Sequence, residues 1–196
     1  DASSATVSAG DIVAEIRHLT INNTGGDSVS IGVGTEDVVD GSVSMLHVTA
    51  TGTGGTNSNY GVRNSSSSPS MTNVTATATG GTYSYGVYNY SSSSPSMNNV
   101  TATATGGTNS YGVYNSQSSS PSMSNVTASA TGGTTTFGVY NSSSSPSMMN
   151  VTATATGGTD SYGVGNYSSS SPSVRSSSIT GDYSIYNSVT SSAQVA

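Results

Sequence analysis

The sequence predicts a single all-β domain, a parallel β-solenoid (β-helix), on the strength of two observations. First, one unit is copied along the middle of the chain: Met45, Met71, Met97 and Met123 follow one another at intervals of 26 residues. Second, each unit contains two stretches in which residue types alternate with period two, separated by Gly-Gly and by Ser-Pro. Near-identical neighbours favour parallel stacking in register, with each side chain about 4.8 Å from its own copy. Each copy is therefore expected to form one coil.

The repeat pattern continues in weaker form at both ends of the chain. Ile16 and Leu19 stand where the regular units carry Met and Val, and Tyr183, Ile185 and Asn187 match the SYGVYN part of the unit. Degenerate outer repeats are typical of solenoid ends. These matches predict about seven coils of roughly 25–29 residues each.

This count defines the expected organisation of the chain. The coils are predicted to span residues 16–187, with the regular repeats at 45–173. The segment 1–15 is expected to add an N-terminal strand, a cap or an assembly contact, and the segment 188–196 a C-terminal strand or assembly contact. Both segments alternate apolar and small polar residues, as strands do.

The first stretch of each unit predicts a strand with a small apolar inner face. Between 71 and 79, Val74, Ala76 and Ala78 alternate with three threonines. The apolar set is expected to face inward and the threonines outward. A helix is excluded because Thr-Ala alternation gives no 3.6-residue stripe and because Gly-Gly and Ser-Pro interrupt every unit.

The second stretch, SYGVYN, predicts another strand, and its columns differ in how freely they vary. One column is always aromatic, so its rings are expected to be buried or stacked; it comprises Tyr60, Tyr85, Tyr111, Phe137, Tyr162 and Tyr183. An invariant valine column is expected to face inward; it comprises Val62, Val87, Val113, Val139 and Val164. A third column varies freely and is expected to face solvent; it comprises Arg63, Tyr88, Tyr114, Tyr140 and Gly165.

Two asparagine columns predict ladders at the corners of the coils, because Asn tolerates left-handed backbone angles and its amide can bond to the next copy. One ladder comprises Asn64, Asn89, Asn115, Asn141, Asn166 and Asn187. The other comprises Asn73, Asn99, Asn125 and Asn150, with His47 and His18 in the same register. We interpret the two histidines as substitutes within the ladder and not as catalysts.

These Asn columns, together with the coil length and the inward aliphatic columns, resemble the right-handed parallel β-helix proteins of the pectate-lyase-like superfamily. The phrase GVYNxSSSPSMxNVTATATGGT also resembles repeats of bacterial surface and tail-fibre-like proteins. The resemblance covers residues 16–187 and implies a right-handed coil. It implies little about activity, because one fold serves many functions.

The acidic residues do not predict an active site. Pectate lyases use clustered Asp and an Arg base, and related hydrolases need converging carboxylates. Here seven of the nine acidic residues lie within residues 1–40, and the regular repeats contain Asp160 alone. We therefore expect no enzyme, no catalytic residues and no cofactor. The weak metal candidate is Glu36, Asp37 and Asp40, for which a solvated loop is the alternative.

Glycosylation is suggested by Asn-x-Ser/Thr sequences at Asn22, Asn64, Asn89, Asn141 and Asn166. The alternative is that a repeated Asn followed by Ser creates such sequences automatically, in which case ladder amides would be unavailable to a glycan. The serine runs that follow could carry O-linked sugars or form plain solvated turns.

An array of threonines predicts a regular outer face. Its central members are Thr75, Thr77, Thr79, Thr101, Thr103, Thr105, Thr152, Thr154 and Thr156. Such Thr-x-Thr rows resemble the ice-binding face of insect-type antifreeze proteins, because a rigid lattice of hydroxyls and methyls can order water. The alternative is that Thr is simply a favourable exposed strand residue.

Composition narrows the function further. With three Arg, no Lys and a net charge of −6, the chain lacks the basic patch that nucleic acids require, and no apolar run is long enough to span a membrane. The predicted solenoid ends carry no obvious cap, which favours head-to-tail polymerisation. We expect a structural subunit of an extracellular filament or surface fibre, with ice binding as one alternative. The other is an adhesin or phage-fibre segment that binds glycans through Tyr88, Tyr114 and Tyr140.

Overall fold

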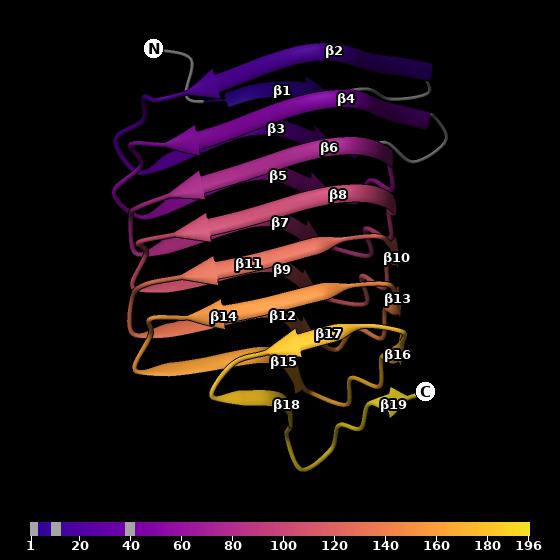
Figure 1. Ribbon diagram of the computed structural model, residues 1–196. Coiled ribbons are helices and arrows are strands. Elements are labelled where there is room, and N and C mark those ends of the chain that lie inside the picture. The colour runs from indigo at the N-terminus through magenta and orange to yellow at the C-terminus, as the bar shows by residue number, and fades with distance from the viewer. Residues whose placement is uncertain (1–3, 9–12, 38–41) are drawn as a thin grey trace.

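The computed structural model confirms the predicted fold class: the chain is a β-solenoid built from parallel strands, with about six turns instead of the predicted seven. It describes residues 4–8, 13–37 and 42–196. Every regular element in these ranges is a strand, and none of them contains a helix that could cross a membrane. The coils stack along one axis, with the N-terminus at one end and the C-terminus at the other (Figure 1).

One wall of the solenoid is an eight-stranded parallel sheet made mainly of SYGVYN segments. Its strands, in spatial order, are β1 (Ser4–Ser8), β3 (Val29–Glu36), β5 (Ser58–Ser65), β7 (Tyr83–Tyr90), β9 (Asn109–Ser116), β12 (Thr135–Ser142), β15 (Asp160–Tyr167) and β18 (Tyr183–Asn187). Equivalent positions of the repeat pair directly, as Tyr85 does with Tyr111. We call this the tyrosine wall.

The Thr-Ala segments form the opposite wall, here called the threonine wall. Its strands are β2 (Val13–Asn23), β4 (Ser42–Thr53), β6 (Ser70–Thr79), β8 (Ser96–Thr105), β11 (Thr127–Thr131), β14 (Thr152–Thr156) and β17 (Ser178–Thr180). A short third wall, the methionine wall, contains β10 (Ser122–Ser124), β13 (Ser147–Met149), β16 (Ser173–Arg175) and β19 (Gln194–Val195). The first residues of β8 pair with β10, so long strands bend from this wall into the threonine wall.

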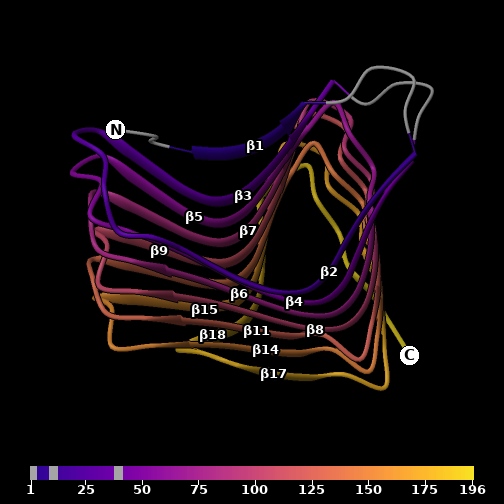
Figure 2. The ribbon, with the colours of Figure 1, turned by 90° about the horizontal axis from the view of Figure 1, so that it is seen from above.

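Seen along the axis, the three walls give the solenoid a three-sided outline (Figure 2). Asn and His residues with positive φ form the corner between the methionine and threonine walls, as in His47 (φ 54°) and Asn99 (φ 54°). Gly-Gly sequences form the corner between the threonine and tyrosine walls. Serine runs, in which Ser91 and Ser92 also have positive φ, return the chain to the methionine wall.

The core is thin and confirms the predicted inward columns. Each coil from Met71 onward in the regular repeats contributes one Met, two Val and two Ala side chains that are almost completely buried, such as Met97 and Val113. A glycine column keeps the walls close together: a Cβ added to Gly112 would lie 2.7 Å from the nitrogen of Ser129 and 2.8 Å from the carbonyl carbon of Ala128 in the threonine wall. Such contacts are shorter than any side chain tolerates, so only glycine fits.

Coil length changes along the axis. Equivalent amides in the regular coils are 25 or 26 residues apart, whereas Asn166 and Asn187 are only 21 apart. The shortening lies at one corner, because Thr154 still pairs with Thr180 while Tyr162 pairs with Tyr183. The last coil therefore lacks the Gly-Gly loop and falls below the predicted 25–29 residues.

Candidate functional site

The threonine wall carries three parallel rows of hydroxyl side chains on its outer face. In β8 the buried Ala102 and Ala104 alternate with outward-facing threonines. Parallel pairing places equivalent residues side by side, with Thr77 next to Thr103 and Thr103 next to Ser129. The rows comprise Thr49, Thr51, Thr53, Thr75, Thr77, Thr79, Thr101, Thr103, Thr105, Thr127, Ser129, Thr131, Thr152, Thr154 and Thr156.

Polar side chains extend these rows into both outer coils. Thr20 pairs with Thr49 and Asn22 with Thr51, while Ser178 and Thr180 continue the pattern after β14. The two outer rows of β8 are exposed and the middle row is half-buried by its neighbours. No charged residue interrupts the rows from β4 to β14. The wall is thus a neutral, regular array of hydroxyl and methyl groups.

The tyrosine wall gathers every Tyr and Phe of the chain into one connected array of rings. Consecutive rings of the always-aromatic column stack with centroids 4.8–5.4 Å apart and nearly parallel planes, in the order Tyr60, Tyr85, Tyr111, Phe137, Tyr162 and Tyr183. A second ladder runs beside it through Tyr88, Tyr114, Tyr140, Tyr167 and Tyr186. Tyr83 and Tyr90 flank the ladders.

Both ladders lie on the same face because the glycine between them interrupts the alternation of the strand. In β7, Ser84, Val87 and Asn89 are buried, whereas Tyr85 and Tyr88 are half-buried on the outside. The ring centroids of Tyr85 and Tyr88 are 5.0 Å apart. The prediction that one column would be stacked is confirmed. The other column lies on the outer face, as predicted, but its rings are half-buried because the two columns pack against each other.

Packing of the rings changes their chemistry. Burial, reinforced by neighbouring phenols, raises the pKa of Tyr85, Tyr111 and Tyr114 far above the ordinary value for tyrosine. These phenols therefore stay protonated above pH 10, where an exposed tyrosine begins to ionise. Within the second ladder, Tyr114 stacks on Tyr140 and Tyr140 on Tyr167, with centroids 4.7 and 5.0 Å apart.

A buried amide ladder fixes the inner side of the tyrosine wall. Asn89 donates through Nδ2 to Oδ1 of Asn115 (2.9 Å), and Asn115 donates to Asn141 (3.0 Å). The same bond repeats from Asn64 to Asn187, always from a coil to the next coil toward the C-terminus. At the other end Thr35 donates its hydroxyl to Asn64 Oδ1 (2.8 Å). The predicted ladder is present and has a single polarity.

The second asparagine column lies at an exposed corner and forms an interrupted ladder, because Asn99 donates to Asn73 Oδ1 whereas Asn125 donates to Asn98, outside the column. Asn150 donates to Asn125 Oδ1 at 3.3 Å, and Asn73 contacts His47 Nε2 at 3.5 Å. His18 stacks on His47 with ring centroids 5.0 Å apart. Every His and Asn residue of this column, from His18 to Asn150, has positive φ, as expected for a corner. The histidines occupy corner positions, with no acidic partner among the described residues.

The serine runs contain ordered ladders that the sequence did not reveal. Backbone N–H groups of Ser94 and Ser120 donate to the hydroxyls of Ser68 and Ser94 in the preceding coil, at 2.8 and 2.9 Å. In the opposite direction, the N–H of Ser67 donates to the buried hydroxyl of Ser93 at 3.0 Å. The sequence feature that could have predicted these ladders is the serine run that precedes Pro in every regular unit. These hydroxyls tie coils together; Ser67 and Ser93 are buried, whereas Ser68, Ser94 and Ser120 remain exposed.

The candidate glycosylation sites differ in their exposure to solvent. The side chains of Asn64, Asn89, Asn141 and Asn166 are fully buried in the amide ladder, so the folded chain offers none of them to a glycan. Asn22 is exposed on the threonine wall.

Of the three metal candidates, Glu36 is half-buried and Asp37 is exposed, while Asp40 lies outside the described residues. In the part of the chain that the structure describes, no three His, Asp or Glu side chains converge on a cation position.

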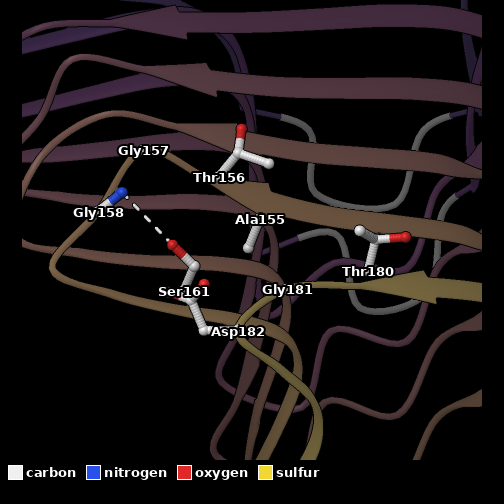
Figure 3. Close-up of a pocket in the computed structure, with 8 residues that line it drawn as sticks. All are labelled: Ala155, Thr156, Gly157, Gly158, Ser161, Thr180, Gly181 and Asp182. Carbon is white, nitrogen blue, oxygen red and sulfur yellow. Dashed lines mark hydrogen bonds between the residues drawn. The ribbon is translucent and has the colours of Figure 1, made fainter.

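The shortened last coil leaves an open notch at its corner (Figure 3). Its lining comprises Ala155, Thr156, Gly157, Gly158, Ser161, Thr180, Gly181 and Asp182. The N–H of Gly158 donates to Ser161 Oγ at 3.3 Å. Asp182 is the single ionisable side chain in this lining, so the notch holds no pair of carboxylates for acid–base chemistry.

The chain was also compared with known proteins. No protein-family description, curated protein sequence or solved structure matches it. Its candidate surfaces are therefore defined by their own geometry.

Proposed function

We propose that this protein is a structural subunit of an extracellular filament or surface fibre, and that it assembles end to end. The observation that carries this proposal is the exposure of the core columns at both ends of the solenoid. Leu19, in the first coil, is 46% exposed, whereas its equivalent Val48 is 1% exposed. At the other end Val195 is 66% exposed, whereas its partner Val174 is 2% exposed.

Larger side chains at these ends support the proposal. Ile21 and Ile179 occupy the column that holds alanine in the regular coils, and both are only partly buried against the core. In the described residues no helix covers either end. Open strand edges with exposed aliphatic side chains favour addition of another strand layer. Contact between the two different ends of identical subunits gives an open filament.

Electron microscopy and sedimentation of the purified protein over a range of concentrations test this proposal. We expect filaments one solenoid wide, whose length increases with concentration. Leu19→Lys, which places a charge on the end surface, is expected to block growth. The matched control Thr101→Lys adds the same charge to the middle of the threonine wall and should still allow filaments. Monodisperse monomers of the unaltered protein at high concentration would reject the proposal.

Ice binding is the second candidate, supported by the uninterrupted rows of the threonine wall. Neutral hydroxyl and methyl groups held by a rigid sheet present a repeating surface about 4.8 Å by 7 Å on which water can order. Thr103 lies at the centre of the array, so Thr103→Tyr should abolish thermal hysteresis. Thr108→Tyr, at an exposed corner outside the rows, should not. Absence of thermal hysteresis in the unaltered protein would remove this candidate.

A further inference from the structure

The free edge of β18 is the most specific unpaired surface of the solenoid. On one side β18 pairs with β15 in register, as Val164 does with Ile185. The chain that follows leaves this wall, because β19 pairs with β16 in the methionine wall. Among the described strands none pairs with the other edge of β18. Its backbone N–H and C=O groups therefore form a template for a further strand.

Side chains of β18 are also uncovered on the side that faces away from β15. The ring of Tyr183 stacks on Tyr162 with centroids 5.0 Å apart, and no described ring covers its other face. Tyr183 is 51% exposed and Tyr186 38% exposed, in contrast to the half-buried rings of the inner coils. Ile185, between them, is partly buried against the core and extends the valine column.

The amide ladder adds a directional requirement. Because each amide donates toward the C-terminal coil, Asn187 accepts a hydrogen bond from Asn166 at 2.9 Å through its oxygen. Its nitrogen makes no hydrogen bond within the described residues, and by the polarity of the ladder it is the donor for a next layer. A strand that completes the ladder must therefore supply an oxygen acceptor in this column.

We propose that the β18 edge is an acceptor site for a parallel strand with the pattern aromatic, Gly, aliphatic, any residue, Asn, as in the repeats of this chain. The repeat segment containing Tyr111, Val113 and Asn115 has this pattern. Such a strand would add a ring on Tyr183, an aliphatic side chain on Ile185 and an amide oxygen for Asn187. The backbone edge alone would bind many sequences, and these three columns select among them.

This inference goes beyond end-to-end assembly, because a second copy does not offer this pattern at its first strand. In the register of the tyrosine wall, β1 has Ser4 in the aromatic column and Val7 in the asparagine column. A homopolymer would thus join this wall by backbone pairing alone. A repeat strand from another chain is the better match for the site.

A titration followed by NMR tests the site on the whole, isotope-labelled protein. One peptide has the sequence of residues 109–116, a second has Leu in place of its Asn at the Asn115 position, and a third has the sequence of residues 4–8. We expect saturable shifts of the amides of residues 183–187 with the first peptide. Binding of the other two should be at least roughly tenfold weaker, the loss expected for one unsatisfied polar group. Equal binding of all three, or shifts elsewhere only, would overturn the proposal.

Two variants distinguish peptide recognition through the amide ladder from non-specific binding. Asn187→Asp keeps an oxygen that accepts from Asn166 but removes the amide donor, so it should erase the preference for Asn over Leu in the peptide. Tyr83→Ala removes an exposed ring away from the edge and should leave binding unchanged. Peptide binding to a protein that remains monomeric would support the site and reject the proposed filament. Filaments that form without any response to the peptide would reject the site alone.

Discussion

The ring of Tyr167 stacks on the ring of Tyr140 with centroids 5.0 Å apart, although the two residues occupy different positions of the repeat. The backbone partner of Tyr140 is Gly165, which has no ring. Tyr167, two residues later on the same face, fills the vacant place, and a Cβ on Gly165 would lie 3.1 Å from its Cε2 atom. The second ladder thereby remains continuous as far as Tyr186.

Tyr167→Ala is therefore expected to destabilise the protein more than Tyr90→Ala does. Tyr167 contacts three rings, whereas the one ring contact of Tyr90 among the described residues is with Tyr88. At about 0.5–1.5 kcal/mol for each of its three ring pairs, the free energy of unfolding should fall by about 1.5–4.5 kcal/mol for Tyr167→Ala. The fall should be about 1 kcal/mol for Tyr90→Ala. Denaturant unfolding measures both, and equal losses would show that ladder continuity is unimportant.

The tyrosine wall should make stability fall in alkali. Burial raises the pKa of Tyr85, Tyr111 and Tyr114, so above the ordinary tyrosine pKa of about 10 the unfolded chain loses protons that the folded chain keeps. Their contribution is complete below about pH 10 and is lost as pH rises toward the folded values. Unfolding followed against pH, with tyrosinate absorbance as the monitor, checks this.

The matched variant for this prediction replaces the same three residues with Phe, as the chain itself does at Phe137. It keeps the rings and removes the ionisable groups. Its stability should decline less above about pH 10 than that of the unaltered protein. An identical alkaline decline in both proteins would assign the effect to other groups.

Breaking the buried amide ladder should cost more than changing an exposed amide. Asn115→Leu leaves the donor of Asn89 and the acceptor of Asn141 without partners in the core. Each unsatisfied group costs about 1–3 kcal/mol, so the free energy of unfolding should fall by about 2–5 kcal/mol. Asn57→Leu, at an exposed corner, is the control and should change it by less than about 0.5 kcal/mol. Equal effects in denaturant unfolding would contradict a structural role for the ladder.

The close approach of the walls predicts a sharp sensitivity at one glycine column. Gly112→Ala would place a Cβ 2.6–2.8 Å from three backbone atoms, which cannot move independently. We expect a loss of about 2–4 kcal/mol or a failure to fold, comparable with severe overpacking. Gly25→Ala meets nothing within 4 Å and has no positive φ, so it should be tolerated. Thermal unfolding of the pair distinguishes close packing from a general intolerance of alanine.

The corner at Asn99 is expected to tolerate glycine but not a β-branched residue. Its φ of 54° is left-handed, which Gly and Asn adopt readily and β-branched residues do not. Asn99→Val should lower the free energy of unfolding by about 1–2 kcal/mol, whereas Asn99→Gly should leave it nearly unchanged. Denaturant unfolding measures both variants. Equal free energies of unfolding for Asn99→Val and Asn99→Gly would show that the corner does not depend on its left-handed backbone angle.

Much of the fold could be predicted from single columns of the repeat. The alternation of Val74, Ala76 and Ala78 with threonines assigns the inner and outer faces of the threonine wall, because residues two apart in a strand share a face. The same rule fails in SYGVYN, because the consecutive residues Gly86 and Val87 are both buried. The alternation therefore shifts by one residue, and Tyr88 lies on the same face as Tyr85. A local pattern cannot reveal such a break, since it depends on how closely the opposite wall approaches.

The sequence by itself determined the parallel coil, its register and its asparagine corners, because these follow from identical residues stacked at a constant interval. Only the tertiary structure decided what the faces became. It combined two tyrosine columns into one wall, turned the serine runs into ladders and buried four of the five candidate glycosylation sites. It also shortened the last coil and left the β18 edge open. These properties depend on contacts between walls and between coils, which residue spacing along one chain does not specify.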